Sequence, residues 1–281
     1  MQITSDKESL RAEGLSREEI NDPDLLPRIR RYWDERAQGF SKTRAFELAG
    51  PLKARWSAEI EPEIRALQKK AERPFKRKIE VLDVGTGTGF LAILAAELGA
   101  RAVGADLSSE MVAAAEQSAQ AAGVGDETLF ITANAERIPY FGDERFDLIV
   151  SRNLVWTLPS PAAAYREWQR LLRPGGRLVI FDADYGAVSF AKLTASLEAE
   201  GVENAHEGIQ ESTLDECDAI KAQLAISAKR RPAWDAECLA KLGFKDIETD
   251  EKLSSRIYLE RDEAWNPVPM FVIRATKPER E

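Results

Sequence analysis

The sequence has little cysteine and histidine, which limits the metal and redox chemistry it can support. Two of the 281 residues are cysteines, Cys217 and Cys238, and one is a histidine, His206. The cysteines are too few and too far apart for a disulfide framework or a C-x-x-C site, so we expect buried, reduced thiols. A zinc site at His206 would need at least one further ligand, so we predict no metal.

Long hydrophobic runs and excess positive charge are also missing. No stretch approaches the roughly 18 uninterrupted apolar residues of a membrane-spanning helix, and the polar N-terminus lacks the apolar core of a signal peptide. We therefore expect a cytoplasmic protein, without membrane insertion, that is a monomer or a homodimer. The chain has 39 Lys and Arg against 48 Asp and Glu, a net charge of -9. This balance disfavours nucleic acid as a partner, because nucleic-acid affinity comes largely from neutralising phosphates.

The pattern of apolar residues divides the chain into four parts. Residues 1–23 are charged and lack apolar periodicity, so we expect them to be disordered. Residues 24–75 show helical spacing and predict an N-terminal cap of two or three helices. The core is expected at 76–184 and 233–281, and residues 185–232 are expected to form a helical insert that covers the site.

Within the core, short apolar strands alternate with helices. Such alternation is typical of parallel βαβ units with right-handed crossovers, and it predicts an α/β, doubly wound sheet with the insert after strand five. The expected strands are 79–84, 102–105, 128–132, 146–151, 178–182, 244–249 and 270–275, and the expected core helices include 90–98, 108–122 and one that begins at 161.

A glycine-rich turn follows the first strand, in the sequence Asp83-Val84-Gly85-Thr86-Gly87-Thr88-Gly89-Phe90. Glycines let backbone amides approach a ligand closely, and dinucleotide-binding proteins use a similar turn. Here Phe90 stands where G-x-G-x-x-G has its third glycine. Asp83 precedes the first glycine by two residues, where a carboxylate would repel a pyrophosphate but attract a cation.

Further polar residues follow the next strands. Asp106 ends the second strand, 21 residues after Gly85 (106 − 85), at the usual place for a carboxylate that binds ribose hydroxyls. Helix capping is the alternative for Asp106, and a plain turn is the alternative for Asn134 after the third strand. Ser151, Arg152 and Asn153 lie at the carboxyl end of the fourth strand, where open α/β sheets place ligands.

Taken in order, these motifs resemble class I S-adenosylmethionine-dependent methyltransferases. The resemblance covers about residues 79–180 and includes F-D-L-I-V-S at 146–151 and P-G-G at 174–176. It is closest to the small-molecule branch that contains ubiquinone and menaquinone biosynthesis methyltransferases. The segment Tyr32-Trp33-Asp34-x-Arg36-Ala37-x-x-Phe40 is similar to the lead-in helix of those enzymes. Asn134 departs from the G-D-A-E usual after strand three, but its oxygen can still accept a hydrogen bond.

This resemblance implies a Rossmann-like sheet of seven strands, mostly parallel, with one antiparallel strand near the edge. It implies S-adenosylmethionine as the cofactor and in-line methyl transfer to a small-molecule acceptor. It assigns Asp83 to the methionine end of the cofactor and Asp106 to the ribose. The full set of implied cofactor-binding residues is Tyr32, Arg36, Asp83, Gly85, Thr86, Gly87, Gly89, Asp106, Leu107, Met111, Asn134, Ala135, Glu136, Ser151 and Arg152.

The sequence assigns no catalytic residue and does not identify the acceptor. Candidates for the acceptor pocket are Tyr32, Trp156, Asp182, Asp184 and Tyr185, with Trp234 and Trp265 as further aromatic candidates. For the two aspartates, a merely polar strand end is the alternative. Two other functions stay open at this stage: an NAD(P)-dependent oxidoreductase on a similar fold, and a non-catalytic protein that binds S-adenosylmethionine.

Overall fold

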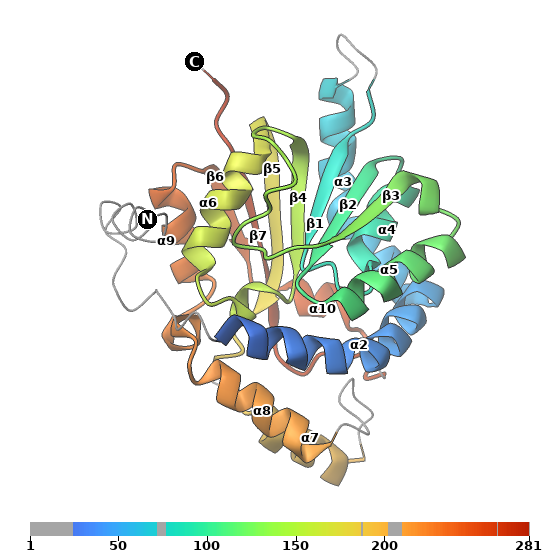
Figure 1. Cartoon of the computed structure of the whole chain (residues 1–281), viewed down its shortest axis with the longest axis vertical. Helices are drawn as coiled ribbons and strands as arrows, with labels where there is room; N and C mark the ends of the chain where they lie inside the picture. The colour runs from blue at the N-terminus through green and yellow to red at the C-terminus, as the bar shows by residue number, and fades with distance from the viewer. Residues whose placement is uncertain (1–24, 72–76, 187, 202–209, 263, 281) are drawn as a thin grey trace.

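The computed structural model describes residues 25–71, 77–186, 188–201, 210–262 and 264–280 (Figure 1). The stretch expected to be disordered, 1–23, and His206 lie outside these residues. Within the described part of the chain, no helix is both long and apolar enough to cross a membrane. The same residues contain no cluster of three or more side chains that could hold a metal ion.

The core is a seven-stranded sheet in the order β3-β2-β1-β4-β5-β7-β6. Neighbouring strands from β3 to β5 are parallel, and β7 runs antiparallel to both β5 and β6. The predicted Rossmann-like sheet, with one antiparallel strand near its edge, is therefore confirmed. The strands are β1 (Glu80–Val84), β2 (Arg101–Asp106), β3 (Thr128–Thr132), β4 (Phe146–Arg152), β5 (Leu172–Ala183), β6 (Lys245–Asp250) and β7 (Met270–Thr276).

Helices cover both faces of this sheet because the central strands are buried on both sides. One face packs on α3 (Pro51–Ala71), α4 (Phe90–Glu97) and α5 (Ser109–Ala121), with Trp56, Ile60 and Phe90 in its core. The other face packs on α6 (Pro161–Leu171) and α9 (Ala233–Lys241), around Tyr165 and Trp168.

A third group of helices lies at the carboxyl ends of the parallel strands, below the sheet in Figure 1. It consists of α2 (Leu25–Ala49), α7 (Phe190–Ala199) and α8 (Glu211–Lys221). Arg28 on α2 is paired with Glu216 on α8 through two hydrogen bonds, one of them 2.6 Å long. Ser108, which caps α5, donates to Asp34 of α2 at 2.6 Å. These contacts attach the long N-terminal helix to both the insert and the core.

Most predicted elements agree with the structure, with differences at their ends. Ser108 accepts from the Met111 amide at 3.1 Å, as expected of an N-cap. Ser160 occupies the cap position of α6 but makes no such side-chain bond. Strand β5 begins at Leu172 rather than 178, and the short helix α10 (Leu253–Ile257) was not predicted. Five residues are too few for helical periodicity to show in the sequence.

Candidate functional site

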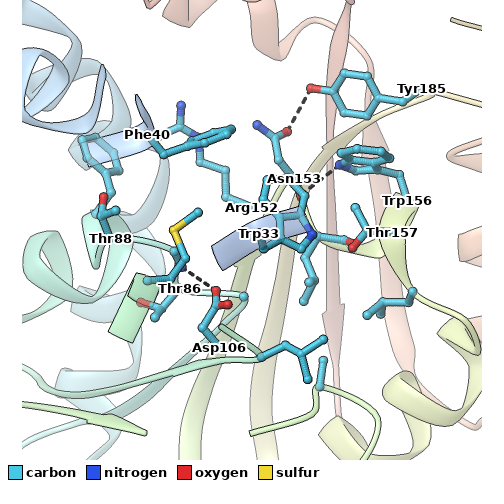
Figure 2. A pocket seen from close by; sticks show the side chains of 18 of the residues that line it. Trp33, Phe40, Thr86, Thr88, Asp106, Arg152, Asn153, Trp156, Thr157 and Tyr185 are labelled. Atoms are coloured by element: carbon cyan, nitrogen blue, oxygen red, sulfur yellow. Dashed lines mark hydrogen bonds between the residues drawn. The ribbon is translucent and has the colours of Figure 1, made fainter. Parts of the chain in front are cut away.

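A cavity of about 180 Å³ opens at the carboxyl ends of β1, β2 and β4 (Figure 2). Side chains from α2 and α7, with Tyr258 and residues 264–268, complete its wall. Because the carboxyl ends of parallel strands meet at one edge, residues far apart in the sequence converge there. The cavity has two halves: the strand-end half, around the glycine loop and Asp106, and the aromatic half, around Trp33, Trp156 and Tyr185.

The glycine loop between β1 and α4 requires glycine at its first turn. Gly85 has a φ of 70°, in the left-handed region. A Cβ atom there would lie 2.8 Å from Cδ1 of Leu154. The amides of Gly85 and Thr86 donate to the Ala105 carbonyl on β2, at 2.8 and 3.0 Å. The loop is thus held tightly against the end of β2 and can present its backbone to a ligand.

Asp83 lies beneath this loop and is 2% exposed. Its Oδ2 accepts from the Thr86 hydroxyl at 2.7 Å and from the Ala92 amide at 3.1 Å. Burial raises the pKa of Asp83 to about 7, although both hydrogen bonds oppose the shift. A cation bound in the cavity would favour the ionised form of this carboxyl group.

Asp106 ends β2 and contributes a carboxylate to the strand-end half. Its Oδ2 accepts from the Gly87 amide at 2.8 Å and its Oδ1 from the Ser108 amide at 3.0 Å. Each oxygen keeps a further lone pair for a ligand hydroxyl. Burial raises the pKa of Asp106 to about 6, again against the effect of the backbone donors. The bond to Gly87 fixes the distance between this carboxylate and the glycine loop.

Thr88 provides a polar atom that nothing in the described structure satisfies. Its side chain is 2% exposed and lines the cavity, yet its Oγ1 has no hydrogen-bond partner among the described residues. A buried hydroxyl without a partner is costly, which favours a ligand with a polar group beside the glycine loop. The zwitterionic methionine end of S-adenosylmethionine fits this requirement.

The loop after β3, which carries Asn134, is only partly exposed to the cavity. Asn134 and Ala135 line it, together with Leu107 and Met111 from the neighbouring turn. The Oδ1 of Asn134 already accepts from the Glu136 amide at 2.9 Å and keeps one lone pair. Glu136 itself does not line the cavity, because its Oε1 accepts from the Ser160 amide at 2.6 Å.

Arg152, at the end of β4, is buried within a charged cluster. Its guanidinium makes two hydrogen bonds to Glu47 of α2, at 3.0 and 2.7 Å, and stacks on Trp56 with 4.0 Å to the ring centre. Arg44 pairs with the same carboxylate. Burial opposes ionisation of Glu47, but the two guanidiniums hold its pKa below the usual range. Two arginines and one glutamate leave this cavity wall with net positive charge.

The aromatic half is built from rings that contact each other edge to face or at a tilt. Trp156 is the centre of this half, with ring-centre distances of 6.1 Å to Trp33, 5.0 Å to Tyr185 and 5.5 Å to Phe190. Phe40 extends the wall, 5.6 Å from Trp33. Such a surface favours a flat, largely apolar ligand.

Most of the sequence-predicted site residues converge on this cavity. Those that line it are Tyr32, Asp83, Gly85, Thr86, Gly87, Asp106, Leu107, Met111, Asn134, Ala135, Arg152, Trp156, Tyr185 and Trp265. Those that do not are Arg36, Gly89, Glu136, Ser151, Asp182, Asp184 and Trp234. Gly89 instead begins α4 with a φ of 89°, and Ser151 is fully buried in β4.

Asp182 is the clearest misplacement by the sequence. It is fully buried and pairs with Arg231 at 2.9 Å, which also binds Asp235. Successive strand residues point to opposite faces of the sheet, and Asp182 points to the face that α6 and α9 cover. Asp184 accepts from the Arg231 amide at 3.3 Å, outside the cavity. Neither aspartate is placed to act as a base or an ammonium anchor in this cavity.

Arg36 lies behind the wall rather than in it. Its guanidinium is 4.9 Å from the ring centre of Phe40, and the residue is 4% exposed. Burial lowers the pKa of Arg36, partly offset by Tyr32 and Cys217.

Sequence reasoning missed several residues of the aromatic half. Phe190, Leu193, Tyr258 and Asn266 all line the cavity, whereas Asn153, which also lines it, was expected at a ligand-binding strand end. The insert and the segment before β7 carry no motif, so their contribution depends on tertiary contacts. A left-handed φ of 55° at Asn153, next to the end of β4, is the kind of outlier that often marks a site.

Comparison with known proteins gives a consistent family. A family model described as "Methyltransferase domain" matches residues 82–180. Methyltransferase GfsG of Streptomyces halstedii is 30% identical over 64% of this chain and 68% of that protein. A tRNA 5-carboxymethoxyuridine methyltransferase of Escherichia coli is 35% identical over 36% of this chain and 39% of that protein. A demethylmenaquinone methyltransferase of Thermus thermophilus is 36% identical over 45% of this chain and 56% of that protein.

The chain therefore spans about two fifths to two thirds of the length of these relatives. Among solved structures, a protein from Methanococcus maripaludis taken to be an S-adenosyl-l-methionine-dependent methyltransferase has a TM-score of 0.51 at 20% identity. The match covers 89% of this chain and 95% of that one, and it supports the fold alone.

Proposed function

Since the chain belongs to the S-adenosylmethionine-dependent methyltransferases, we propose that it methylates a small, flat acceptor held in the aromatic half of the cavity. The observation that carries this proposal is the continuity of the cavity. One continuous cavity is lined at one end by the glycine loop and Asp106, and at the other by Trp156 and Tyr185. No finding supports the oxidoreductase or the non-catalytic alternative.

The strand-end half supplies the groups that a cationic nucleoside needs. When bound, S-adenosylmethionine provides a methyl group made electrophilic by its sulfonium sulfur. We assign Asp106 to the ribose hydroxyls, because both of its oxygens keep a free lone pair. Asp83 shapes the glycine loop and adds negative charge beneath it. Asn134, Leu107 and Met111 border the proposed adenine position.

The aromatic half would orient the acceptor and exclude water. Methyl transfer is an in-line displacement with a neutral leaving group, so alignment can supply much of the acceleration, about 7–11 kcal/mol in favourable cases. Among the described lining residues, the only carboxylates are Asp83 and Asp106, in the strand-end half. We therefore assign no general base to this chain.

We further propose that α2 and the insert together cover the acceptor. Tyr32, Trp33 and Phe40 of α2 line the cavity, as do Phe190 and Leu193 of α7. The ion pair between Arg28 of α2 and Glu216 of α8 attaches the N-terminal helix to the insert. Cys217 and Cys238 are buried thiols that form no disulfide in the described part of the chain, which supports action in the reducing cytoplasm.

The direct test is a metabolite screen with isotope-labelled methyl donor. The purified chain is incubated with labelled S-adenosylmethionine and a small-molecule extract, and the labelled product is identified by mass spectrometry. A parallel incubation with total tRNA tests the activity of the Escherichia coli tRNA methyltransferase to which the chain is similar. We expect label in a small, flat compound and none in tRNA. Label in tRNA alone would contradict the proposal. The net charge of -9 also disfavours tRNA as a substrate.

A further inference from the structure

The aromatic half contains a chain of hydrogen bonds whose direction is set from one end. From it we infer that the Asn153 side chain donates a hydrogen bond to an oxygen of the methyl-accepting substrate, and that this substrate is a phenolate or enolate compound. This inference rests on the proposed function and narrows it to a substrate class.

This series of hydrogen bonds begins at the Val268 backbone amide and ends at the Asn153 side chain, which lines the cavity. The Val268 amide donates to Oδ1 of Asn266 at 3.0 Å. Nδ2 of Asn266 donates to the Tyr185 hydroxyl at 2.7 Å. The Tyr185 hydroxyl donates to Oδ1 of Asn153 at 3.2 Å. Figure 2 shows the last of these bonds, with Asn153 between Tyr185 and the cavity.

Each step fixes the polarity of the next. A backbone N–H can only donate, so the oxygen of the Asn266 amide faces Val268 and its nitrogen faces Tyr185. That nitrogen can only donate, so the Tyr185 oxygen accepts and its proton is directed at Asn153. Burial raises the pKa of Tyr185, which keeps this proton in place. The Asn153 side chain must therefore present its oxygen to Tyr185 and its nitrogen elsewhere.

The backbone of Asn153 is also held in place. Its amide donates to the Phe181 carbonyl at 2.8 Å, and its own carbonyl accepts from Nε1 of Trp156 at 2.9 Å. Its φ of 55° lies in the left-handed region, which asparagine adopts more readily than most residues. In Figure 2 the amide nitrogen of Asn153 faces away from Tyr185. Within the described part of the chain, no residue accepts a hydrogen bond from this nitrogen.

The surroundings favour an electron-rich oxygen on a flat frame. Trp33, Trp156 and Phe190 supply ring surfaces, and Arg44 adds positive charge to the same cavity. In the aromatic half, the described lining residues include no carboxylate or imidazole that could bind an ammonium group. A phenolate or enolate oxygen matches both the donor and the local charge, because hydrogen bonds to ionised acceptors are the stronger ones.

The test uses two probes of the same shape and opposite hydrogen-bonding character. Pentafluorophenolate offers an anionic acceptor oxygen, whereas pentafluoroaniline offers N–H donors. Each is titrated by ¹⁹F NMR into the full chain saturated with S-adenosylhomocysteine. We expect the wild type to bind the phenolate at least about tenfold more tightly than the aniline, the difference typical of a charge-assisted hydrogen bond.

The informative variant is Asn153→Asp, which keeps shape and tolerates the same backbone conformation. It still accepts from Tyr185 but presents an oxygen to the cavity. We expect phenolate affinity to fall at least about tenfold and aniline affinity to rise. A gain of aniline binding cannot come from misfolding. An unchanged preference between the two probes would overturn the inference.

Tyr185→Phe tests the positioning role of the hydrogen-bond chain. Without the hydroxyl, the Asn153 amide is free to rotate, so the preference for phenolate should shrink while the affinity for S-adenosylhomocysteine stays within about twofold. Tyr140→Phe is the control, because Tyr140 is 64% exposed.

The outcomes separate the two proposals. If S-adenosylhomocysteine does not bind the folded wild type, the proposed function fails. If it binds but the wild type prefers aniline or binds neither probe, only the assignment of Asn153 fails.

Discussion

The two halves of the cavity are built in different ways. The strand-end half is built mainly from backbone amides of the glycine loop and two carboxylates, Asp83 within β1 and Asp106 at the end of β2, with Leu107, Met111 and Asn134 at its border. The aromatic half draws its side chains from α2, α7, the segments that follow β4 and β5, and the segment before β7. The first half depends on local loop geometry, and the second on how distant segments pack. Substitutions in the two halves should therefore affect different measurements.

The largest expected effect concerns Glu47 and the two arginines with which it pairs, because the pair with Arg152 attaches α2 to the end of β4. Glu47→Gln removes the carboxylate that pairs with both Arg44 and Arg152, and Glu47 is fully buried. Leaving buried guanidiniums without their counter-charge should lower the free energy of unfolding by about 3–5 kcal/mol. Urea denaturation measures this change.

The control for that experiment is Glu61→Gln on α3. Glu61 pairs with Arg65 where both side chains are about half exposed, so its loss should cost less than about 1 kcal/mol. Equal losses in the two variants would mean that the buried cluster does not anchor α2.

The next effect separates cofactor binding from stability. Asp106→Asn replaces a carboxylate that we assign to both ribose hydroxyls. The loss of charge-assisted bonds should weaken S-adenosylhomocysteine binding by about a hundredfold, as measured by calorimetry. Asp126→Asn removes one negative charge from an exposed turn and should leave affinity unchanged. Comparable affinities in the two variants would argue against the ribose assignment.

A substitution in α7 should impair methyl transfer without weakening the binding of S-adenosylhomocysteine. Leu193→Trp places a larger ring at the wall of the aromatic half, where it should hinder the acceptor and leave the strand-end half free. We expect methyl transfer to the acceptor found in the screen to fall about tenfold through misalignment, with unchanged affinity for S-adenosylhomocysteine. Ser196→Trp, at an exposed position of the same helix, should leave transfer intact. A joint loss of transfer and affinity in Leu193→Trp would break the distinction between the halves.

The smallest effect is a pH dependence confined to the strand-end half. Burial raises the pKa of Asp83 to about 7 and that of Asp106 to about 6. Both are ionised above these values, so affinity for the cationic S-adenosylmethionine should fall a few-fold as the pH drops from about 8 to about 6. Calorimetry across this range measures the fall. Asp83→Asn should flatten the profile, and an unchanged profile would contradict its role.

The same carboxyl groups affect the stability of the free protein with the opposite sign. Their folded-state pKa values exceed the unfolded ones, so the folded chain binds more protons between about pH 4 and 7. Their contribution to stability therefore rises as the pH falls through this window. Glu47, whose pKa is lowered, contributes in the reverse direction. Only the difference between wild type and Asp83→Asn isolates the effect of Asp83.

Much of the fold follows from local pattern. The strand at 128–132 was predicted with the bounds it has in the structure. The strand-end half was equally predictable, because Asp83, Gly85 and Asp106 lie at the carboxyl ends of strands that must share one edge of the sheet. Asp182 shows the limit of that reasoning, since position along a strand does not reveal which face a side chain occupies.

By itself, the sequence determined the alternation of strands and helices, the glycine loop and the carboxylates beside it. These features depend on residues that are neighbours in the chain or on strand ends that parallel pairing brings together. Only the tertiary structure decided that Asn153, Phe190 and Asn266 share one cavity. Their contacts join segments more than 30 residues apart, and no periodicity records such packing.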